Sequence, residues 1–158
     1  MIDLEKCFYN YSPILLTNKV EEKYLLKNLS NVEFLQKYGD RETISQEEFE
    51  TTSYYKGLMW SFNKNKHIYG IYDAKQAYLQ ANYFLALFHA FKNGTYEENC
   101  RKEKFVNRHS CSAKFLFKKM INLKDYYMII EGHHRLSCLY VLNKKLIENK
   151  DYILIGGK

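Results

Sequence analysis

The alternation of hydrophobic and polar residues predicts helices in the first hundred residues and a strand–turn–helix–strand segment at the C-terminal end. The longest helical pattern covers residues 77–91, where apolar side chains recur every three or four positions. Asp73 with Gln76 forms a capping pair before this helix, and Asn93 and Gly94 end it. We therefore expect one long helix with an apolar stripe that faces the core.

Shorter patterns precede this helix. Residues 19–38 alternate charged and apolar side chains, which is typical of one or two amphipathic helices. Residues 46–62 repeat apolar and aromatic side chains at helical spacing, and Ser45 with Glu48 forms a capping box at their start. Residues 12–17 are a short apolar run with a proline near its start, which favours an edge strand or another extended segment.

The positive charge of the chain is concentrated in one stretch. Seven of the 24 basic residues but one of the 18 acidic residues lie between Arg101 and Lys119. Such a patch attracts nucleic acid, a nucleotide or a phosphorylated metabolite, or it is simply a solvated loop. We expect residues 95–112 to form this surface loop, in which Ser110 and Ser112 could add hydroxyl contacts to a ligand.

The stretch of residues 126–142 contains the densest group of chemically active side chains. Its first five residues are apolar or aromatic and predict a buried strand, whereas its last eight lack Gly and Pro and predict a helix. The turn between strand and helix reads Glu131-Gly132-His133-His134-Arg135. A glycine there admits a backbone conformation closed to other residues, and the first amides of the helix attract anions. This turn is therefore predicted to hold a phosphate.

Each polar side chain of this turn has more than one interpretation. Glu131 is a candidate general base or metal-ion partner, or an acceptor that pairs with Arg135 across the turn. Arg135 offers a planar fork for two phosphate oxygens. His133 and His134 would project about 100° apart on a helix, so one faces the anion while the other packs or orients Glu131. His134 and Cys138 have the i, i+4 spacing of a zinc pair, but without further ligands we assign no metal site and place Cys138 in the core.

Several classes of protein are excluded by the sequence. No run approaches the 18 apolar residues of a membrane span, and the N-terminus lacks the features of a signal peptide, so we expect a cytoplasmic protein without membrane contact. The four cysteines form no CxxC pair and are expected to be reduced and mostly buried. No GxSxG, Walker A or GxGxxG sequence occurs, so a nucleophile elbow and the common nucleotide folds are not indicated.

Residues 129–136, Ile-Ile-Glu-Gly-His-His-Arg-Leu, resemble the [I/V]-[D/E]-G-x-H-R-L signature of the ParB/sulfiredoxin-like superfamily. The resemblance covers residues 125–155 and implies a small α/β fold in which this turn binds the phosphates of a nucleotide. Members include partition proteins that use CTP, ATP-dependent sulfinic acid reductases, and kinases that act on free serine. The chain leaves no room for the helix-turn-helix region of partition proteins, and His133 stands where sulfiredoxins place their reactive cysteine. The serine kinases are most similar at the turn, although their separate catalytic Glu does not align.

The predicted fold is α/β or α+β, in one domain over residues 1–158. A mainly helical part, residues 1–100, packs on a small sheet of the ParB/sulfiredoxin-like type in residues 101–158, with strand–turn–helix–strand at the C-terminus. The last strand, residues 152–155, is expected to run parallel to the strand of residues 126–130 through a right-handed crossover.

The leading hypothesis is a nucleotide-dependent enzyme, either a phosphotransferase acting on a small hydroxyl-bearing metabolite or a nucleotide hydrolase. The phosphates of ATP, ADP or CTP would be held by Gly132, His134, Arg135, Ser110 and Ser112. Glu131 or His133 would take the hydroxyl proton or organise Mg²⁺, so that catalysis would depend on positioning and charge stabilisation. The alternatives are a nucleic-acid-binding accessory protein and a non-catalytic ligand-binding module. The oligomeric state is left open.

Overall fold

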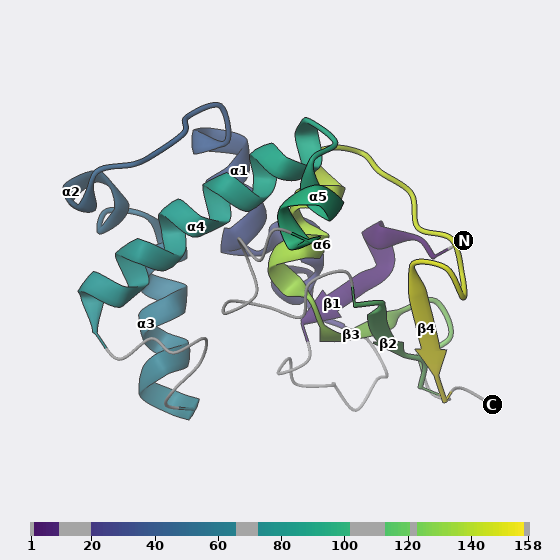
Figure 1. Ribbon diagram of the computed structural model, residues 1–158. Helices are drawn as coiled ribbons and strands as arrows, with labels where there is room; N and C mark the ends of the chain where they lie inside the picture. Colours follow the sequence, from purple (N-terminus) through teal and green to yellow (C-terminus); the bar gives the residue numbers. More distant parts are fainter. Residues whose placement is uncertain (1, 10–19, 66–72, 102–112, 121–122, 157–158) are drawn as a thin grey trace. The chain divides into compact units, whose positions relative to one another are not determined.

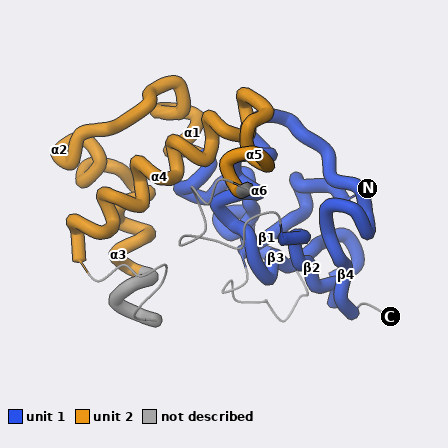
Figure 2. Tube along the Cα trace, in the orientation of Figure 1, with its two compact units in different colours: residues 1–32, 113–158 blue, residues 33–112 orange. Residues whose placement is uncertain are grey.

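The computed structural model of the chain describes residues 2–9, 20–65, 73–101, 113–120 and 123–156 (Figure 1). Contacts within the chain group into two compact units (Figure 2). Unit 1 contains residues 1–32 and 113–158, and unit 2 contains residues 33–112. The first 32 residues, which the sequence pattern groups with the helical part, thus belong with the C-terminal segment. The described elements are helices and a mixed sheet, so the fold is of the α+β class.

Within the described residues, unit 1 contains a mixed sheet of four strands in the order β1-β3-β2-β4 (Figure 1). In that order, the strands are Cys7–Tyr9, Tyr127–Glu131, Phe115–Lys118 and Tyr152–Ile155. Strand β3 runs parallel to β1 and antiparallel to β2, while β2 and β4 are parallel. The predicted parallel pair of β3 and β4 is therefore wrong. The reason is that β2 pairs with both strands and separates them.

The remaining described elements of unit 1 are short 3-10 helices and one α-helix. The 3-10 helices are η1 (Leu4–Lys6), η2 (Glu22–Tyr24) and η3 (Leu26–Asn28), and the α-helix is α6 (His133–Val141). The amphipathic pattern of residues 19–38 thus yields an α-helix only at its end, in α1 (Ser30–Tyr38). The cause is Leu25, which has an extended backbone and forms an antiparallel bridge with Phe8. A residue committed to a β-bridge cannot continue a helix.

Unit 2 is helical and encloses an aromatic core. Besides most of α1, its elements are α2 (Gln46–Phe49), α3 (Ser53–Asn65), α4 (Ala74–Lys92) and α5 (Tyr96–Arg101). The ring centroid of Tyr54 lies 4.7 Å from that of Phe34 and 5.3 Å from that of Phe84. The prediction for α4 is confirmed: the Asp73 side chain accepts a hydrogen bond from the Gln76 amide at 2.9 Å. The chain leaves this helix at Asn93, as expected.

The helix predicted over residues 46–62 is interrupted. Ser45 caps its start as expected, by accepting a hydrogen bond from the Glu48 amide at 3.2 Å. The break follows from the two threonines after α2, whose hydroxyls donate to the carbonyls of Glu48 and Phe49. Thr52 then accepts a hydrogen bond from the Tyr55 amide at 3.0 Å and so begins α3.

Two further predictions are changed or left open by the structure. The loop predicted over residues 95–112 begins instead with α5, while residues 102–112 and the apolar run of residues 12–17 lie outside the described residues. Cys7 and Cys138 are buried and free, but Cys100 is disulfide-bonded, so the expectation of reduced thiols is wrong for Cys100. A disulfide depends on the spatial approach of two residues, which sequence spacing does not reveal. Among the described helices, none has the length and apolar character that crossing a bilayer requires.

Candidate functional site

The junction of β3 and α6 has the backbone that the sequence predicts. Gly132 is the N-cap residue of α6, with φ 96° and ψ 29°, and its carbonyl accepts the Leu136 amide at 2.8 Å. A positive φ of this kind is strained for residues with a side chain, so the prediction for Gly132 is confirmed. Because glycine has no side chain to cap them, the first amides of α6 keep the partial positive charge of a helix start.

The space beside the backbone of Gly132 is filled by side chains of the same protein. A Cβ atom built on Gly132 would lie 2.7 Å from Cδ1 of Phe115 and 3.3 Å from Nη2 of Arg135. An aromatic ring of β2 and the guanidinium of Arg135 on α6 therefore approach the backbone of this glycine closely. Any larger residue here would displace both of these groups.

Strand β3 is less buried than its composition suggests. Only Ile129 of this strand is fully buried, so the prediction of a buried strand is wrong. Glu131 at the end of the strand is exposed. One face of the sheet is buried, at Ile129, Phe115 and Phe117, and alternate residues point away from that face. The register of the β2–β3 pair shifts between Leu116 and Phe117, next to the junction, as in a β-bulge.

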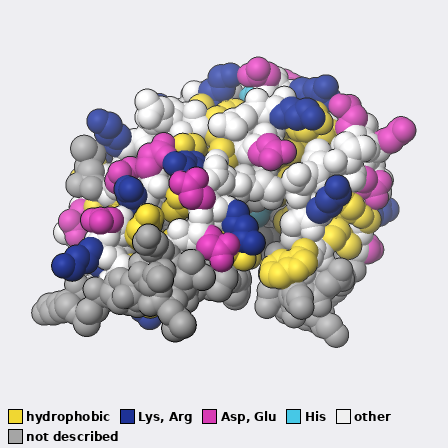
Figure 3. Space-filling view, turned by 180° about the vertical axis from the view of Figure 1, so that it is seen from behind, with side chains coloured by type: hydrophobic (Ala, Val, Ile, Leu, Met, Phe, Trp, Pro, Cys, Tyr) yellow, Lys and Arg dark blue, Asp and Glu magenta, His cyan; other side chains and the backbone are white. Residues whose placement is uncertain are grey.

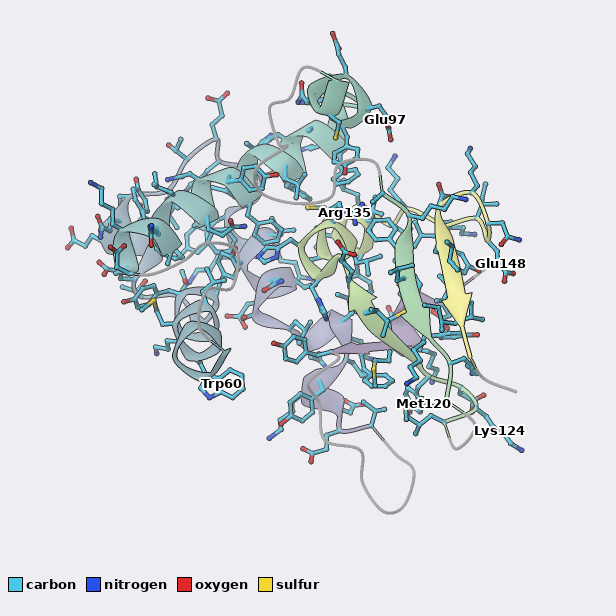
Figure 4. All side chains as sticks on the ribbon, turned by 60° about the horizontal axis from the view of Figure 1, so that its bottom comes forward. Trp60, Glu97, Met120, Lys124, Arg135 and Glu148 are labelled. Atoms are coloured by element: carbon cyan, nitrogen blue, oxygen red, sulfur yellow. The ribbon has the colours of Figure 1, made fainter. Side chains whose placement is uncertain are left out.

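Arg135 is buried, and no described acidic side chain pairs with it. Its side chain is 3% exposed, and Figure 4 shows it on α6. Nη1 donates a hydrogen bond to the Ala113 carbonyl at 2.7 Å, and the guanidinium carbon lies 4.4 Å from the ring centroid of Phe115. Among the described residues, no ion pair that includes Arg135 is observed, and its buried Nε has no hydrogen-bond partner. The alternative of a structural ion pair with Glu131 is therefore not realised.

His133 is the second buried polar side chain of the junction. Its ring lies edge-on to that of Tyr9, with 5.0 Å between centroids, and its Nε2 is buried without a hydrogen-bond partner. Burial lowers the pKa of His133 to about 4, so the ring is neutral near pH 7. A neutral imidazole with so low a pKa is a weak general base, which favours a binding role for this residue. His134 is only half-buried, so the two histidines do occupy different environments, as expected.

The two aromatic rings reach the junction from opposite neighbours of β3. Tyr9 ends β1 and pairs with Ile129, whereas Phe115 begins β2, the strand on the other side. Each ring contacts one of the two side chains with an unpartnered nitrogen, His133 or Arg135. Sequence reasoning missed Tyr9, because the three-residue strand β1 is too short to give a pattern.

Only some of the remaining polar and thiol side chains lie within the described residues. Ser110 and Ser112 lie outside the described residues. Ser137 is buried, and its hydroxyl donates to the His133 carbonyl at 2.7 Å. Cys138 is fully buried, as its interpretation as a core residue predicts. In the described part of the chain, no three His, Cys, Asp or Glu side chains gather as they would around a metal ion.

Comparison of the chain with protein-family models, with curated proteins and with solved structures gave no match. Membership of the ParB/sulfiredoxin-like superfamily therefore stays a prediction from residues 125–155.

Proposed function

We propose that the β3–α6 junction binds the phosphate group of a nucleotide or of a phosphorylated metabolite. The supporting observation is the buried guanidinium of Arg135, for which the described residues supply no carboxylate partner and no hydrogen-bond partner for Nε. A buried charge is costly unless it is paired, and contact with the Phe115 ring compensates only in part. A phosphate beside Arg135 would supply the missing negative charge.

The geometry of Arg135 favours a ligand with two oxygen atoms. Nη1 is occupied by the Ala113 carbonyl, which leaves the edge formed by Nε and Nη2. Charged donors side by side on a planar guanidinium match two oxygens of one phosphate. The first amides of α6 and Nε2 of His133 would add donors from the same helix end.

The reaction that we propose for this site is phosphoryl transfer from ATP, ADP or CTP to a small hydroxyl-bearing metabolite. Glu131 is exposed at the end of β3, where it would take the hydroxyl proton or organise Mg²⁺. Positioning and charge stabilisation supply most of the catalysis in such reactions, which suits a site built from Arg135 and helix amides. A cytoplasmic location for this activity is part of the same proposal.

A second candidate is a ligand-binding module without turnover. The low pKa of His133 favours this candidate, because an imidazole with that pKa is a weak base and His133 is one of the two predicted bases. The nucleic-acid alternative has no comparable supporting observation among the described residues, and three of the seven basic residues of its segment lie in residues 102–112, outside them. On the face seen in Figure 3, the described basic side chains are interspersed with acidic ones.

The test is calorimetric titration of the protein with phosphate, ATP, ADP and CTP, with and without Mg²⁺. We expect binding in the wild type and its loss in Arg135→Met, which removes the charge but keeps an unbranched side chain. Arg41→Met is the matched control, because Arg41 is exposed in unit 2 and pairs with Glu48. Absence of binding to every titrant, or equal binding by Arg135→Met, would refute the site.

Turnover separates the two candidates. Incubation with a bound nucleotide and a metabolite pool, followed by ³¹P NMR, should show a new phosphate ester that disappears with Glu131→Gln. Unchanged nucleotide after long incubation would identify a binding module instead.

A further inference from the structure

Arg135 is held in two different ways, by Ala113 just before β2 and by Phe115 at its start. Ala113 fixes one nitrogen, because its carbonyl accepts the Nη1 hydrogen bond at 2.7 Å. Phe115 covers one side of the guanidinium, with 4.4 Å between the guanidinium carbon and the ring centroid. The hydrogen bond sets the direction of the guanidinium, and contact with the ring limits its rotation.

The ring of Phe115 packs against the backbone of the turn in space that Gly132 leaves open. Its Cδ1 and Cε1 would lie 2.7 Å and 3.0 Å from a Cβ atom on Gly132, a space that only glycine leaves open. The same Cβ would lie 3.3 Å from Arg135 Nη2. The ring and the guanidinium therefore fit together against the backbone of the turn, with the Nε–Nη2 edge beside the start of α6.

We propose that Phe115 is a positioning residue of the anion site, whose ring orients the guanidinium of Arg135 so that Nε and Nη2 meet two oxygens of one phosphate. This inference rests on the proposed function. An orientation that exists before the ligand arrives reduces the ordering cost of binding. Without the ring, Arg135 keeps its charge and the Ala113 hydrogen bond but loses the contact on its face, so that a phosphate meets a less ordered donor pair.

A matched residue separates positioning from a general effect on the core. Phe117 lies two positions further along β2 and is also buried, and its ring packs edge-on against Tyr152 with 5.6 Å between centroids. Replacing either phenylalanine by leucine removes a similar buried volume from the same strand. Of these two phenylalanines, Phe115 is the one with a described contact to Arg135.

The experiment compares phosphate affinity in the wild type, Phe115→Leu, Phe115→Tyr and Phe117→Leu by calorimetry. We expect Phe115→Leu to weaken binding by about tenfold, as the loss of a partly desolvated cation–π contact would. Phe115→Tyr, which keeps the ring, should restore affinity, and Phe117→Leu should bind as the wild type does. Equal affinity of Phe115→Leu and the wild type, or equal losses in the two leucine variants, would overturn the inference.

The Arg135 Nε–Hε resonance gives a second readout that needs no ligand. In ¹⁵N NMR spectra of the unliganded wild type and Phe117→Leu, this resonance should be sharp, and in Phe115→Leu it should broaden or shift toward the value of a mobile arginine. An unchanged resonance in Phe115→Leu contradicts the positioning role whether or not phosphate binds. A wild type that shows this ordered resonance yet fails to bind phosphate would refute the proposed function and leave the orientation by Phe115 established.

Discussion

Both units bury apolar side chains, but they differ in the polar side chains that they bury. In unit 2, the rings of Phe34, Phe49, Tyr54 and Phe84 are almost completely buried, and they contact one another. In unit 1, the β3–α6 junction also buries His133 and Arg135, and each has a buried nitrogen with no hydrogen-bond partner among the described residues. Burial of rings stabilises the fold by removing apolar surface from water. Burial of unpartnered polar groups destabilises it, so the junction is expected to exist for a ligand.

The buried polar residues are unevenly distributed among the described residues. Four such side chains are buried, and three of them, His133, Arg135 and Ser137, are on α6. The fourth is Gln80 in unit 2, whose Oε1 is also unpartnered. A neutral amide oxygen costs less to bury than a charge does, so the contrast between the units depends chiefly on Arg135.

The largest expected effect is the loss of a ring from the core of unit 2. Phe84→Ala should lower the free energy of unfolding by about 3 to 5 kcal/mol, because a fully buried phenylalanine leaves a cavity. Denaturant unfolding followed by circular dichroism measures this loss. A loss of only about 0.5 kcal/mol, typical of a surface position, would show that the ring of Phe84 does not contribute to a packed core.

A slightly smaller effect is expected from pH at the junction. The pKa of His133 is about 4 in the folded protein, below the ordinary value of 6.5, so the unfolded chain binds a proton more readily between these pH values. The stability contributed by the neutral ring is complete above pH 6.5 and is lost as the pH falls toward 4, by about 3 kcal/mol. His133→Gln should flatten this part of the stability curve. An identical pH dependence in wild type and variant would show that His133 is not buried in its neutral form.

A pair of glycines offers a matched comparison between the units. Gly94 in unit 2 has φ 72°, but a Cβ atom added to it would meet nothing within 4 Å, whereas the space beside Gly132 is filled. Gly94→Ala should therefore cost only the backbone strain, about 1 to 2 kcal/mol. Gly132→Ala should cost more in denaturant unfolding and should also weaken phosphate binding, because it displaces Phe115 and Arg135. Equal losses of stability in the two variants would mean that the packing at Gly132 is not tight.

Local signals in the sequence are sufficient for the turn and for the helices that begin at strong caps. The Asp73 cap, the left-handed Gly132 and the start of α6 at His133 are predictable because each depends on a few adjacent residues. Strand β1 is not predictable in this way, since three residues give no periodicity, and its place beside β3 follows from contacts distant in sequence.

The environment of the candidate site could not be predicted for the same reason. The burial of Arg135 depends on Ala113 and Phe115, which lie about twenty residues earlier and reach it only because β2 pairs with β3. The low pKa of His133 likewise follows from its burial in unit 1. The residue types in the turn are therefore sufficient to predict an anion site. The protonation and orientation of those residues depend on contacts distant in sequence, which the folded structure supplies.

The central claim is that Arg135 is buried for a ligand rather than for stability. The most direct test is the free energy of unfolding of the wild type and of Arg135→Met, each measured with and without phosphate. Without phosphate, the variant should be as stable as the wild type or more stable, because replacing a buried charge by an apolar side chain is often neutral or favourable. With phosphate at about a hundred times its dissociation constant, the wild type should gain about 2.7 kcal/mol and the variant nothing. A variant that is several kcal/mol less stable without phosphate, beside a wild type that phosphate does not stabilise, would contradict the account.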